Sequence, residues 1–258
     1  MSNPDDSVAR TILVAVVLCL VCSILVSGAA VMLRPVQQAN KTLDRQRNIL
    51  EIAGIPADEG RIAKAFGSIE ARVVDLANGS YVGDLDPLTY DARKAARDPA
   101  RSTELQGGSD IARIGRLAQH ATVYLMREGD RITRVILPVH GYGLWSTLYG
   151  FLALEGDGRT ISGLKFYEHA ETPGLGGEVD NPDWRAQWAG KVAYDEAGYP
   201  AIEVVRGKAD PASDAYQHQV DGLSGATLTS KGVENLVRFW LGPLAFGPYI
   251  ERLRAGEA

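Results

Sequence analysis

The sequence predicts an α+β protein: one membrane-spanning helix, then a domain with a twisted antiparallel sheet and flanking helices. Three observations predict this fold class. Residues 11–33 form an apolar run without any charge. From residue 121 onward, apolar and polar residues alternate in segments separated by short turns rich in Gly, Asp and Glu, a pattern typical of antiparallel hairpins. After residue 230 the period changes to that of an amphipathic helix.

Length, charge and cysteine content limit the classes of protein. The 258 residues allow one membrane segment and a folded part of one large or two small domains. The net charge of -5 and the scattered basic residues exclude a nucleic-acid-binding surface. The two cysteines, Cys19 and Cys22, lie inside the apolar run without a second ligand pair, so we interpret them as small apolar residues of the helix. No cysteine follows them, so no disulfide supports the rest of the chain.

The N-terminal part is expected to anchor the protein in a membrane. Residues 1–10 form a short tail, and residues 11–33, at about 1.5 Å per residue, are long enough to cross a hydrocarbon core of about 30 Å. A cleaved signal peptide would have a shorter apolar core of about 7–15 residues, which favours an uncleaved anchor. This run contains no ionisable group and therefore offers no carboxylate to a translocated ion.

A stalk helix is predicted to leave the membrane. Arg34-Pro35 is expected to end the membrane segment, and the stalk covers residues 34–56 until Gly54 and Pro56 stop it. The folded domain then covers residues 57–258. It begins with a short helix at about residues 58–69, which carries apolar residues on one face.

The middle of the chain is predicted to be a surface loop followed by a hairpin-rich sheet. Residues 86–110 are rich in Asp, Pro, Arg, Gly and Ser with little periodicity, which predicts a long surface excursion. Period-two segments then predict four antiparallel strands and a third strand pair, at 121–127, 131–139, 146–154, 159–169, 191–194 and 201–207. This order argues against a doubly wound nucleotide-binding fold.

Small residues, hydroxyls and one acid are concentrated in residues 221–230, immediately before the last strongly periodic helix. That helix is predicted to start near Thr229 or Ser230 and to end at Gly242-Pro243. Its unpaired N-terminal amides favour a phosphate, and Gly225 and Ala226 are too small to keep one away. From the residues alone, a capped turn leading into a core helix is the alternative.

A serine nucleophile is the competing interpretation of the same segment. A nucleophile elbow requires Gly-x-Ser-x-Gly, whereas Gly222-Leu223-Ser224 is followed by Gly225-Ala226, so the last glycine is misplaced. We therefore predict no catalytic nucleophile at Ser224.

Two glycine-rich loops interrupt the predicted sheet, one at residues 140–145 and one at residues 171–177. Neither supplies G-x-G-x-x-G between a strand and a helix, so no nicotinamide site is predicted. Trp145 is either a core aromatic or a contact to a cofactor ring. For His140 and His169 a satisfied histidine is favoured over a proton-transfer role. Core packing is expected for the remaining tryptophans, Trp184, Trp188 and Trp240.

The string Asp221-Gly222-Leu223-Ser224-Gly225-Ala226-Thr227 resembles the signature in which a flavin transferase esterifies the final Thr with the phosphate of FMN. The whole chain resembles the C subunit of the bacterial Na+-translocating NADH:quinone reductases and, more distantly, the G subunit of Rnf electron-transport complexes. The resemblance implies one covalent FMN per chain, on Thr227. It also implies that the loops H-G-x-G-L-W and E-T-P-G-L-G line the flavin.

The resemblance implies neither a catalytic residue nor a metal ligand. The expected cofactor-binding residues are Thr227, Asp221, Ser224, Gly225, Ala226, Leu144, Trp145, Glu171, Thr172, Gly174, Leu175 and Gly176. An isoalloxazine ring needs apolar faces and a few edge hydrogen bonds, which these side chains could supply. Lys231 departs from the small or polar residue expected there; it either helps to hold the phosphate or is a solvated lysine.

The implied function is a membrane-anchored electron carrier. By resemblance, it relays electrons between redox centres of its neighbours in a complex of six subunits that oxidises NADH, reduces ubiquinone and exports Na+. The chain itself would carry no NADH site. The alternatives are the G subunit of an Rnf-type complex and a non-catalytic FMN-binding sensor or assembly domain, which need not undergo flavin reduction when NADH is supplied.

Two arguments about topology conflict. Basic residues are more numerous beyond the apolar run than before it, which by the positive-inside tendency places the domain in the cytoplasm. They are Arg10 on the N-terminal side and Arg34, Lys41, Arg45 and Arg47 beyond. The resemblance implies the opposite: a single-pass protein of the bacterial inner membrane whose domain is periplasmic, where the flavin transferase works. We expect the periplasmic placement, since the charge bias is a statistical preference that long exported domains override.

Overall fold

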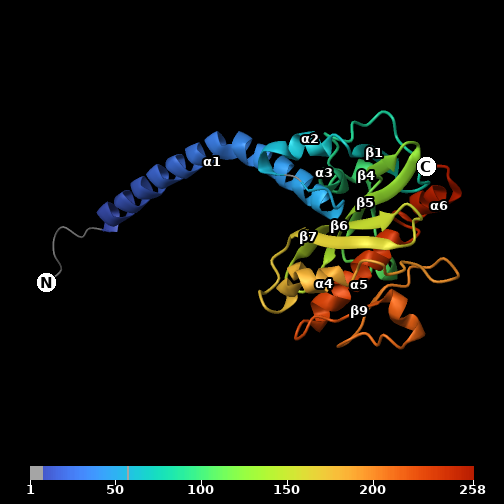
Figure 1. Cartoon of the computed structure of the whole chain (residues 1–258). Coiled ribbons are helices and arrows are strands. Elements are labelled where there is room, and N and C mark those ends of the chain that lie inside the picture. The colour runs from blue at the N-terminus through green and yellow to red at the C-terminus, as the bar shows by residue number, and fades with distance from the viewer. Residues whose placement is uncertain (1–7, 57) are drawn as a thin grey trace. The chain divides into compact units, whose positions relative to one another are not determined.

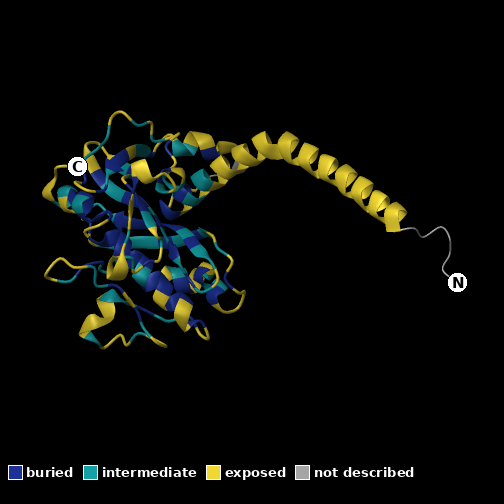
Figure 2. Ribbon diagram, turned by 180° about the vertical axis from the view of Figure 1, so that it is seen from behind, coloured by how far each residue is buried: buried dark blue, intermediate teal, exposed yellow. Residues whose placement is uncertain are grey.

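The computed structural model describes residues 8–56 and 58–258, and the chain divides into two compact units, Met1–Gln46 and Arg47–Ala258. The described part of the first unit is a single helix, the beginning of α1 (Val8–Ile52). Residues 8–44 are all exposed, as the yellow ribbon in Figure 2 shows. By length and composition, this helix is able to cross a membrane.

Arg34-Pro35, which was expected to end the membrane segment, does not interrupt the helix, because α1 continues through Pro35 to Ile52. A proline removes one backbone hydrogen bond and crowds the preceding turn. The helical residues on both sides propagate the helix across that defect, since adding a residue to a formed helix is far easier than nucleating a new one. Membrane segment and stalk are therefore parts of one helix.

The second unit contains a five-stranded antiparallel sheet in the order β1-β4-β5-β6-β7 (Figure 1). Its strands are β1 (Glu70–Asp75), β4 (His120–Glu128), β5 (Arg131–Tyr142), β6 (Thr147–Glu155) and β7 (Ile161–Glu168). The last four are the predicted strands, joined as three successive hairpins. The predicted α+β class is confirmed.

The sheet is buried on both faces. Neighbouring residues of β5 alternate between two apolar clusters, as expected from the two-residue period of a strand: Val135 and Leu137 belong to one, Ile136 to the other. Helix α5 (Thr227–Leu241) packs in the larger cluster, together with α6 (Gly247–Ala255). The smaller cluster contains the last turn of α1, which buries Ile49 and Leu50.

Short elements complete the domain. The predicted helix at residues 58–69 is shorter than expected and consists of η1 (Glu59–Arg61) and α2 (Ile62–Phe66). Between β7 and α5 lie η4 (Gly176–Asp180), α4 (Pro182–Ala186), β8 (Glu203–Val204), η5 (Asp214–His218) and β9 (Gln219–Val220). Trp184 and Trp188 are buried in the core and contact each other edge to face, as predicted.

Two predictions about the chain between elements are wrong. Residues 86–110 are not simply a loop, since they include α3 (Ala92–Ala96), η2 (Pro99–Arg101), β2 (Ser102–Glu104) and η3 (Gly107–Ser109). β2 pairs with β3 (Arg116–Ala118), and Tyr90 and Ala95 are buried in a small cluster against β1. The predicted third hairpin is reduced to a single bridge between Tyr194 and Pro200, because β8 pairs in parallel with β9 instead.

Candidate functional site

The site candidate is the start of helix α5, which begins at Thr227 rather than at Thr229 or Ser230. The predicted start is wrong by two or three residues, because Ser230 N already donates to Ala226 O at 3.0 Å and closes the first turn there. Ala226 occupies the N-cap position and provides no side-chain cap. Thr227 is therefore the first helical residue, where backbone N–H groups and the helix dipole favour an anion.

The hydroxyls of this segment fall into two groups. Ser224 and Thr227 are exposed, whereas Thr229 and Ser230 are buried. Thr229 Oγ1 donates to Glu171 Oε2 at 2.7 Å, and Ser230 Oγ accepts from Leu223 N at 2.9 Å. Thr229 and Ser230 are thus committed to internal contacts, and the hydroxyls available to an incoming group are those of Ser224 and Thr227.

Glu171 connects the helix to the first glycine-rich loop. Glu171 is 5% exposed, and its Oε1 atom accepts hydrogen bonds from three backbone N–H groups at 3.0–3.2 Å. The donors are Leu144, Trp145 and Ser146. Burial of this carboxyl opposes its ionisation, but the hydrogen bonds from Thr229 and from these amides outweigh burial and hold the pKa of Glu171 below its ordinary value. Glu171 is therefore an ionised carboxylate whose two oxygens both accept hydrogen bonds. It forms the junction between the first glycine-rich loop and α5.

Glycines permit this close packing. A Cβ at Gly176 would lie 2.6 Å from Glu171 Oε2, and one at Gly143 would lie 2.7 Å from Glu171 Oε1. A Cβ at Gly232 on α5 would lie 2.6 Å from Tyr142 O. Both glycine-rich loops and the first turns of α5 thus meet at distances that no side chain allows. The structure brings the three predicted segments together.

Large apolar side chains are left exposed around this junction. Trp145 is 66% exposed, which excludes the core role considered for it, and Leu175 and Leu228 are also exposed. Leu175 reaches the motif at 221–227, because a Cβ at Gly225 would lie 2.9 Å from the Leu175 Cδ2 atom. Leu144 is half-buried. Exposed apolar residues beside small ones are the surroundings that a flat aromatic cofactor requires.

The second loop has a tight internal structure. Thr172 O accepts from Leu175 N at 3.1 Å and from Gly177 N at 2.9 Å. Gly174 has a φ of 74°, a conformation that favours glycine. Thr172 and Gly174 are exposed, so the loop presents its rim to solvent while Glu171 is buried at its base.

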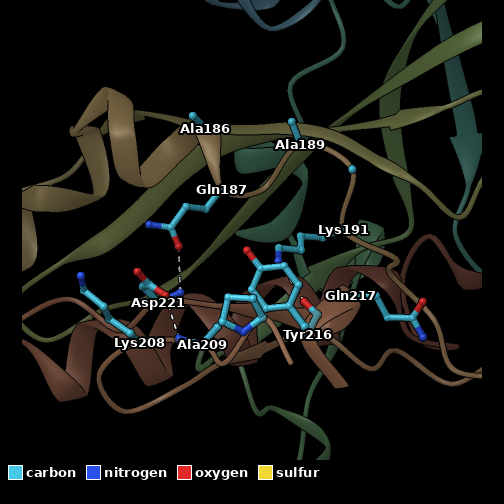
Figure 3. A pocket seen from close by; sticks show the side chains of 11 residues that line it. Ala186, Gln187, Ala189, Lys191, Lys208, Ala209, Tyr216, Gln217 and Asp221 are labelled. Atoms are coloured by element: carbon cyan, nitrogen blue, oxygen red, sulfur yellow. Dashed lines mark hydrogen bonds between the residues drawn. The ribbon is translucent and has the colours of Figure 1, made fainter. Parts of the chain in front are cut away.

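Asp221 lies apart from this junction. Its carboxylate Oδ1 accepts from Ala209 N at 2.8 Å, and its backbone contacts Gln187 Oε1 and Trp184 Nε1. Asp221 lines an open pocket of about 690 Å³ (Figure 3). Of the predicted site residues, only Asp221 lines that pocket. Asp221 therefore fixes the start of the motif against the neighbouring loops.

The two histidines have structural partners. His140 is stacked on Tyr149 and tilted against Trp240, and burial, reinforced by Arg93, lowers its pKa to about 4. His169 Nε2 lies 2.8 Å from Asp180 Oδ2. The predicted core role of Trp240 is confirmed: it is 4% exposed, and its Nε1 donates to His140 O at 2.6 Å.

Lys231 contacts its own helix. Its ammonium pairs with the buried carboxylate of Glu234, which Arg238 also contacts at 3.3 Å. Glu234 in turn accepts from Val204 N at 3.2 Å. These bonds attach β8 to α5, and they give Lys231 a role that does not involve a phosphate.

Sequence reasoning did not identify Arg113 as a site residue. Its Nη2 atom donates to Gly143 O at 2.8 Å, and its guanidinium lies 4.7 Å from the centroid of the Tyr142 ring. It comes from a turn without periodicity, and the sequence offers no signal for it other than a charged residue two positions before Gly115. Thr229 was likewise expected only as a helix-start residue.

Chemically, the arrangement provides an exposed hydroxyl at a helix N-terminus, a loop of amides fixed by a buried carboxylate, and exposed apolar side chains nearby. This combination suits a phosphate group attached to a planar ring system. Among the residues that the structure describes, no group of three or more His, Cys, Asp or Glu side chains is placed to hold a metal ion.

Comparisons with known proteins agree with this arrangement. Residues 143–242 match the model of the FMN-binding domain family. The chain is 54% identical over 262 residues to the C subunit of the Na(+)-translocating NADH-quinone reductase of Pseudomonas aeruginosa, covering 100% of both chains. It is 53% identical to the C subunit of the same reductase of Vibrio vulnificus, covering 98% of each.

Solved structures give the same result. The crystal structure of NqrC from Shewanella oneidensis matches with a TM-score of 0.78 and 34% identity, over 84% of this chain and 99% of that one. The crystal structure of the C subunit of the Na(+)-translocating NADH-quinone reductase from Parabacteroides distasonis matches with a TM-score of 0.66 and 27% identity, over 84% of this chain and 96% of that one.

Proposed function

The chain belongs to the family of C subunits of the Na(+)-translocating NADH-quinone reductases, and from this premise we propose that it carries its FMN covalently, as a phosphoester on Thr227. The chain is an FMN-dependent electron carrier and one of several subunits of an oxidoreductase complex. Within residues 8–56 and 58–258, one helix is long and apolar enough to cross a membrane, which together with the family supports a single-pass protein of the inner membrane.

The accessibility of the hydroxyls carries the proposal of Thr227. Of the four hydroxyl residues between 224 and 230, Thr229 and Ser230 are buried and hydrogen-bonded, while Ser224 and Thr227 are exposed. Thr227 alone combines exposure with the first position of α5. An ester phosphate there is next to backbone N–H groups and the positive end of the helix dipole, which stabilise its negative charge.

Attachment requires a modifying enzyme, and we propose a flavin transferase as that partner. In the step, the Thr227 oxygen forms a bond to the phosphorus of an activated flavin nucleotide, the bond to the leaving group breaks, and the hydroxyl proton is released. When bound, FMN supplies the electron-transfer chemistry, and the protein supplies position and electrostatics. Trp145 and Leu175 provide exposed apolar contacts for the ring, and Glu171 holds their loops in place.

The remaining finer roles are also proposals. The flavin, one per chain, relays electrons between redox centres of neighbouring chains in a complex of six subunits, in which the overall reaction oxidises NADH, reduces ubiquinone and exports Na+. Domains 11–33, 34–56 and 57–258 correspond to membrane segment, stalk and flavin domain. Asp221, Ser224, Gly225, Ala226, Leu144, Thr172, Gly174 and Gly176 complete the binding site.

The domain is proposed to face the periplasm. The exposed Thr227 hydroxyl must be accessible to the flavin transferase, which the family resemblance places outside the cytoplasmic membrane. A C-terminal alkaline phosphatase fusion, which is active only when exported, tests this placement. An inactive phosphatase in a stably expressed fusion places the domain in the cytoplasm instead.

The attachment site is tested by three single substitutions in the full chain, each co-expressed with a flavin transferase. After denaturing electrophoresis, Thr227→Ala should show no fluorescent band, whereas Ser224→Ala should retain one because its hydroxyl is not the acceptor. Thr227→Ser keeps a hydroxyl at the same position and controls for loss of the methyl group. A full-intensity band in Thr227→Ala contradicts the proposal.

A further inference from the structure

Arg113 has an unusual backbone conformation. Among the described residues 8–56 and 58–258, it is the only non-glycine residue with a positive φ, at 55°. An L-residue with a Cβ avoids this region because of steric crowding, and a conformation of this kind persists only where its surroundings enforce it. The contacts around Arg113 must therefore enforce this conformation.

The turn containing Arg113 is fixed by Asp110. Arg113 N donates to Asp110 O at 3.1 Å, and the two oxygens of the Asp110 carboxylate accept from Ile114 N at 2.9 Å and Gly115 N at 2.8 Å. The same turn is attached to the end of β5, since Tyr142 N donates to Ala112 O at 2.8 Å. The turn is thus held by the Asp110 carboxylate on one side and by the end of β5 on the other.

The strained backbone of Arg113 determines where its guanidinium lies. Arg113 Nη2 donates to Gly143 O at 2.8 Å, and the group lies over the ring of Tyr142. The planar guanidinium suits both contacts at once, which a lysine ammonium does not. Arg113 is an exposed residue, so burial of its side chain does not account for the strained backbone.

Gly143 is the first residue of the loop that Glu171 binds. The carbonyl of Gly143 accepts from Arg113, and the next three amides donate to Glu171 Oε1. The loop is therefore held from two sides, by a cation on its first carbonyl and by an anion on its following N–H groups. Trp145, the exposed aromatic residue, lies within this segment.

We propose that Arg113 is a positioning residue for the flavin: its left-handed backbone places the guanidinium on the Gly143 carbonyl, fixes the 143–146 loop and adds a positive charge beside the flavin site. The positioning of the loop stands on the contacts above, and its effect on the flavin rests on the proposed function. The strained conformation serves the site and costs stability.

Three variants of the full chain separate the contributions of the guanidinium, its positive charge and the strained backbone. Arg113→Met removes the guanidinium and keeps the strained backbone. Arg113→Gly removes the guanidinium and relieves the strain, so its Tm should exceed that of Arg113→Met by about 2–4 °C. Arg113→Lys keeps the charge. Arg72→Met is the matched control, because Arg72 is also an exposed arginine over a tyrosine ring, on β1.

Amide hydrogen exchange, measured on the chain without flavin, tests whether Arg113 fixes the 143–146 loop. In Arg113→Met and Arg113→Gly, the amides of Leu144, Trp145 and Ser146 should exchange about tenfold faster than in the wild type, since one charge-assisted hydrogen bond is lost. Arg113→Lys, whose ammonium does not make both contacts, should exchange faster than the wild type but more slowly than Arg113→Met. Unchanged exchange in both Arg113→Met and Arg113→Gly overturns the proposal, whatever the fate of the flavin.

The reduction potential of the flavin tests the electrostatic effect of the Arg113 charge. A positive charge beside the flavin stabilises its more negative reduced form, so at a fixed ambient potential Arg113→Met should have less reduced flavin than the wild type. Arg113→Lys and Arg72→Met should match the wild type. An unchanged potential in Arg113→Met removes the electrostatic role, and absence of covalent flavin in the wild type refutes the attachment proposal instead.

Discussion

Replacing Glu171 with Gln tests the junction that joins both loops to α5. The carboxylate accepts three amides on Oε1 and the Thr229 hydroxyl on Oε2. An amide offers one acceptor oxygen and no charge, so the bonds that remain are neutral and weaker. The expected loss is about 3 kcal/mol of unfolding free energy, which lowers Tm by about 6–12 °C for a domain of this size.

The same substitution should change the dependence of stability on pH. The pKa of Glu171 is lower in the folded protein: burial raises it, but the Thr229 hydroxyl and the loop amides lower it more. A carboxyl of this kind contributes stability that is present above the unfolded pKa, about 4.3, and is lost as the pH falls through the folded pKa. The difference in stability between wild type and Glu171→Gln should therefore shrink in acid.

Thermal and urea unfolding of the full chain in detergent, at neutral pH and in acid, measures both effects. Glu168→Gln is the control, because Glu168 is an exposed carboxylate on β7 that pairs with Arg93, and it should change stability by less than about 1 kcal/mol. If Glu171→Gln were as stable as Glu168→Gln, with the same pH dependence as the wild type, Glu171 would not be the junction described.

Three further outcomes are expected. Gly176→Ala should destabilise the domain by about 1–3 kcal/mol in urea unfolding and reduce covalent flavin, because its Cβ would lie 2.6 Å from Glu171 Oε2; wild-type behaviour would show that the loops relax freely. Trp145→Ala should change stability by no more than about 0.5 kcal/mol but alter flavin fluorescence, since Trp145 is exposed; an unaltered emission would place the ring elsewhere. The isolated chain should not be reduced by NADH in stopped-flow absorbance, whereas dithionite should reduce it; rapid bleaching by NADH would reveal a missed substrate site.

Hydrophobic periodicity predicted the elements whose burial pattern is local. The alternation along β4 to β7 and the apolar face of α5 depend on neighbouring residues, and both are found where expected. β1 was missed because its burial comes from pairing with β4, about 50 residues away. The segment at 86–110 is ordered by contacts of Tyr90 and Ala95 with distant strands, which composition does not encode.

The candidate site was predictable as three segments but not as a network. The motif at 221–227 and the two glycine-rich loops were identified from the sequence, and they meet in the fold. The contact between Glu171 and Thr229 joins residues 58 positions apart and depends on Gly176 and Gly143 leaving space. Arg113 acts through its left-handed backbone conformation. Glycine is the residue type that marks such a conformation in a sequence, and an arginine does not predict it.

Peptide mapping of the chain expressed with a flavin transferase tests the central claim most directly. Tandem mass spectrometry of the proteolytic peptide that spans residues 221–231 should locate one FMN, less one water, on Thr227, with Ser224, Thr229 and Ser230 unmodified. FMN on any of those three residues, or complete release of the flavin on denaturation, would contradict covalent attachment at the first residue of α5.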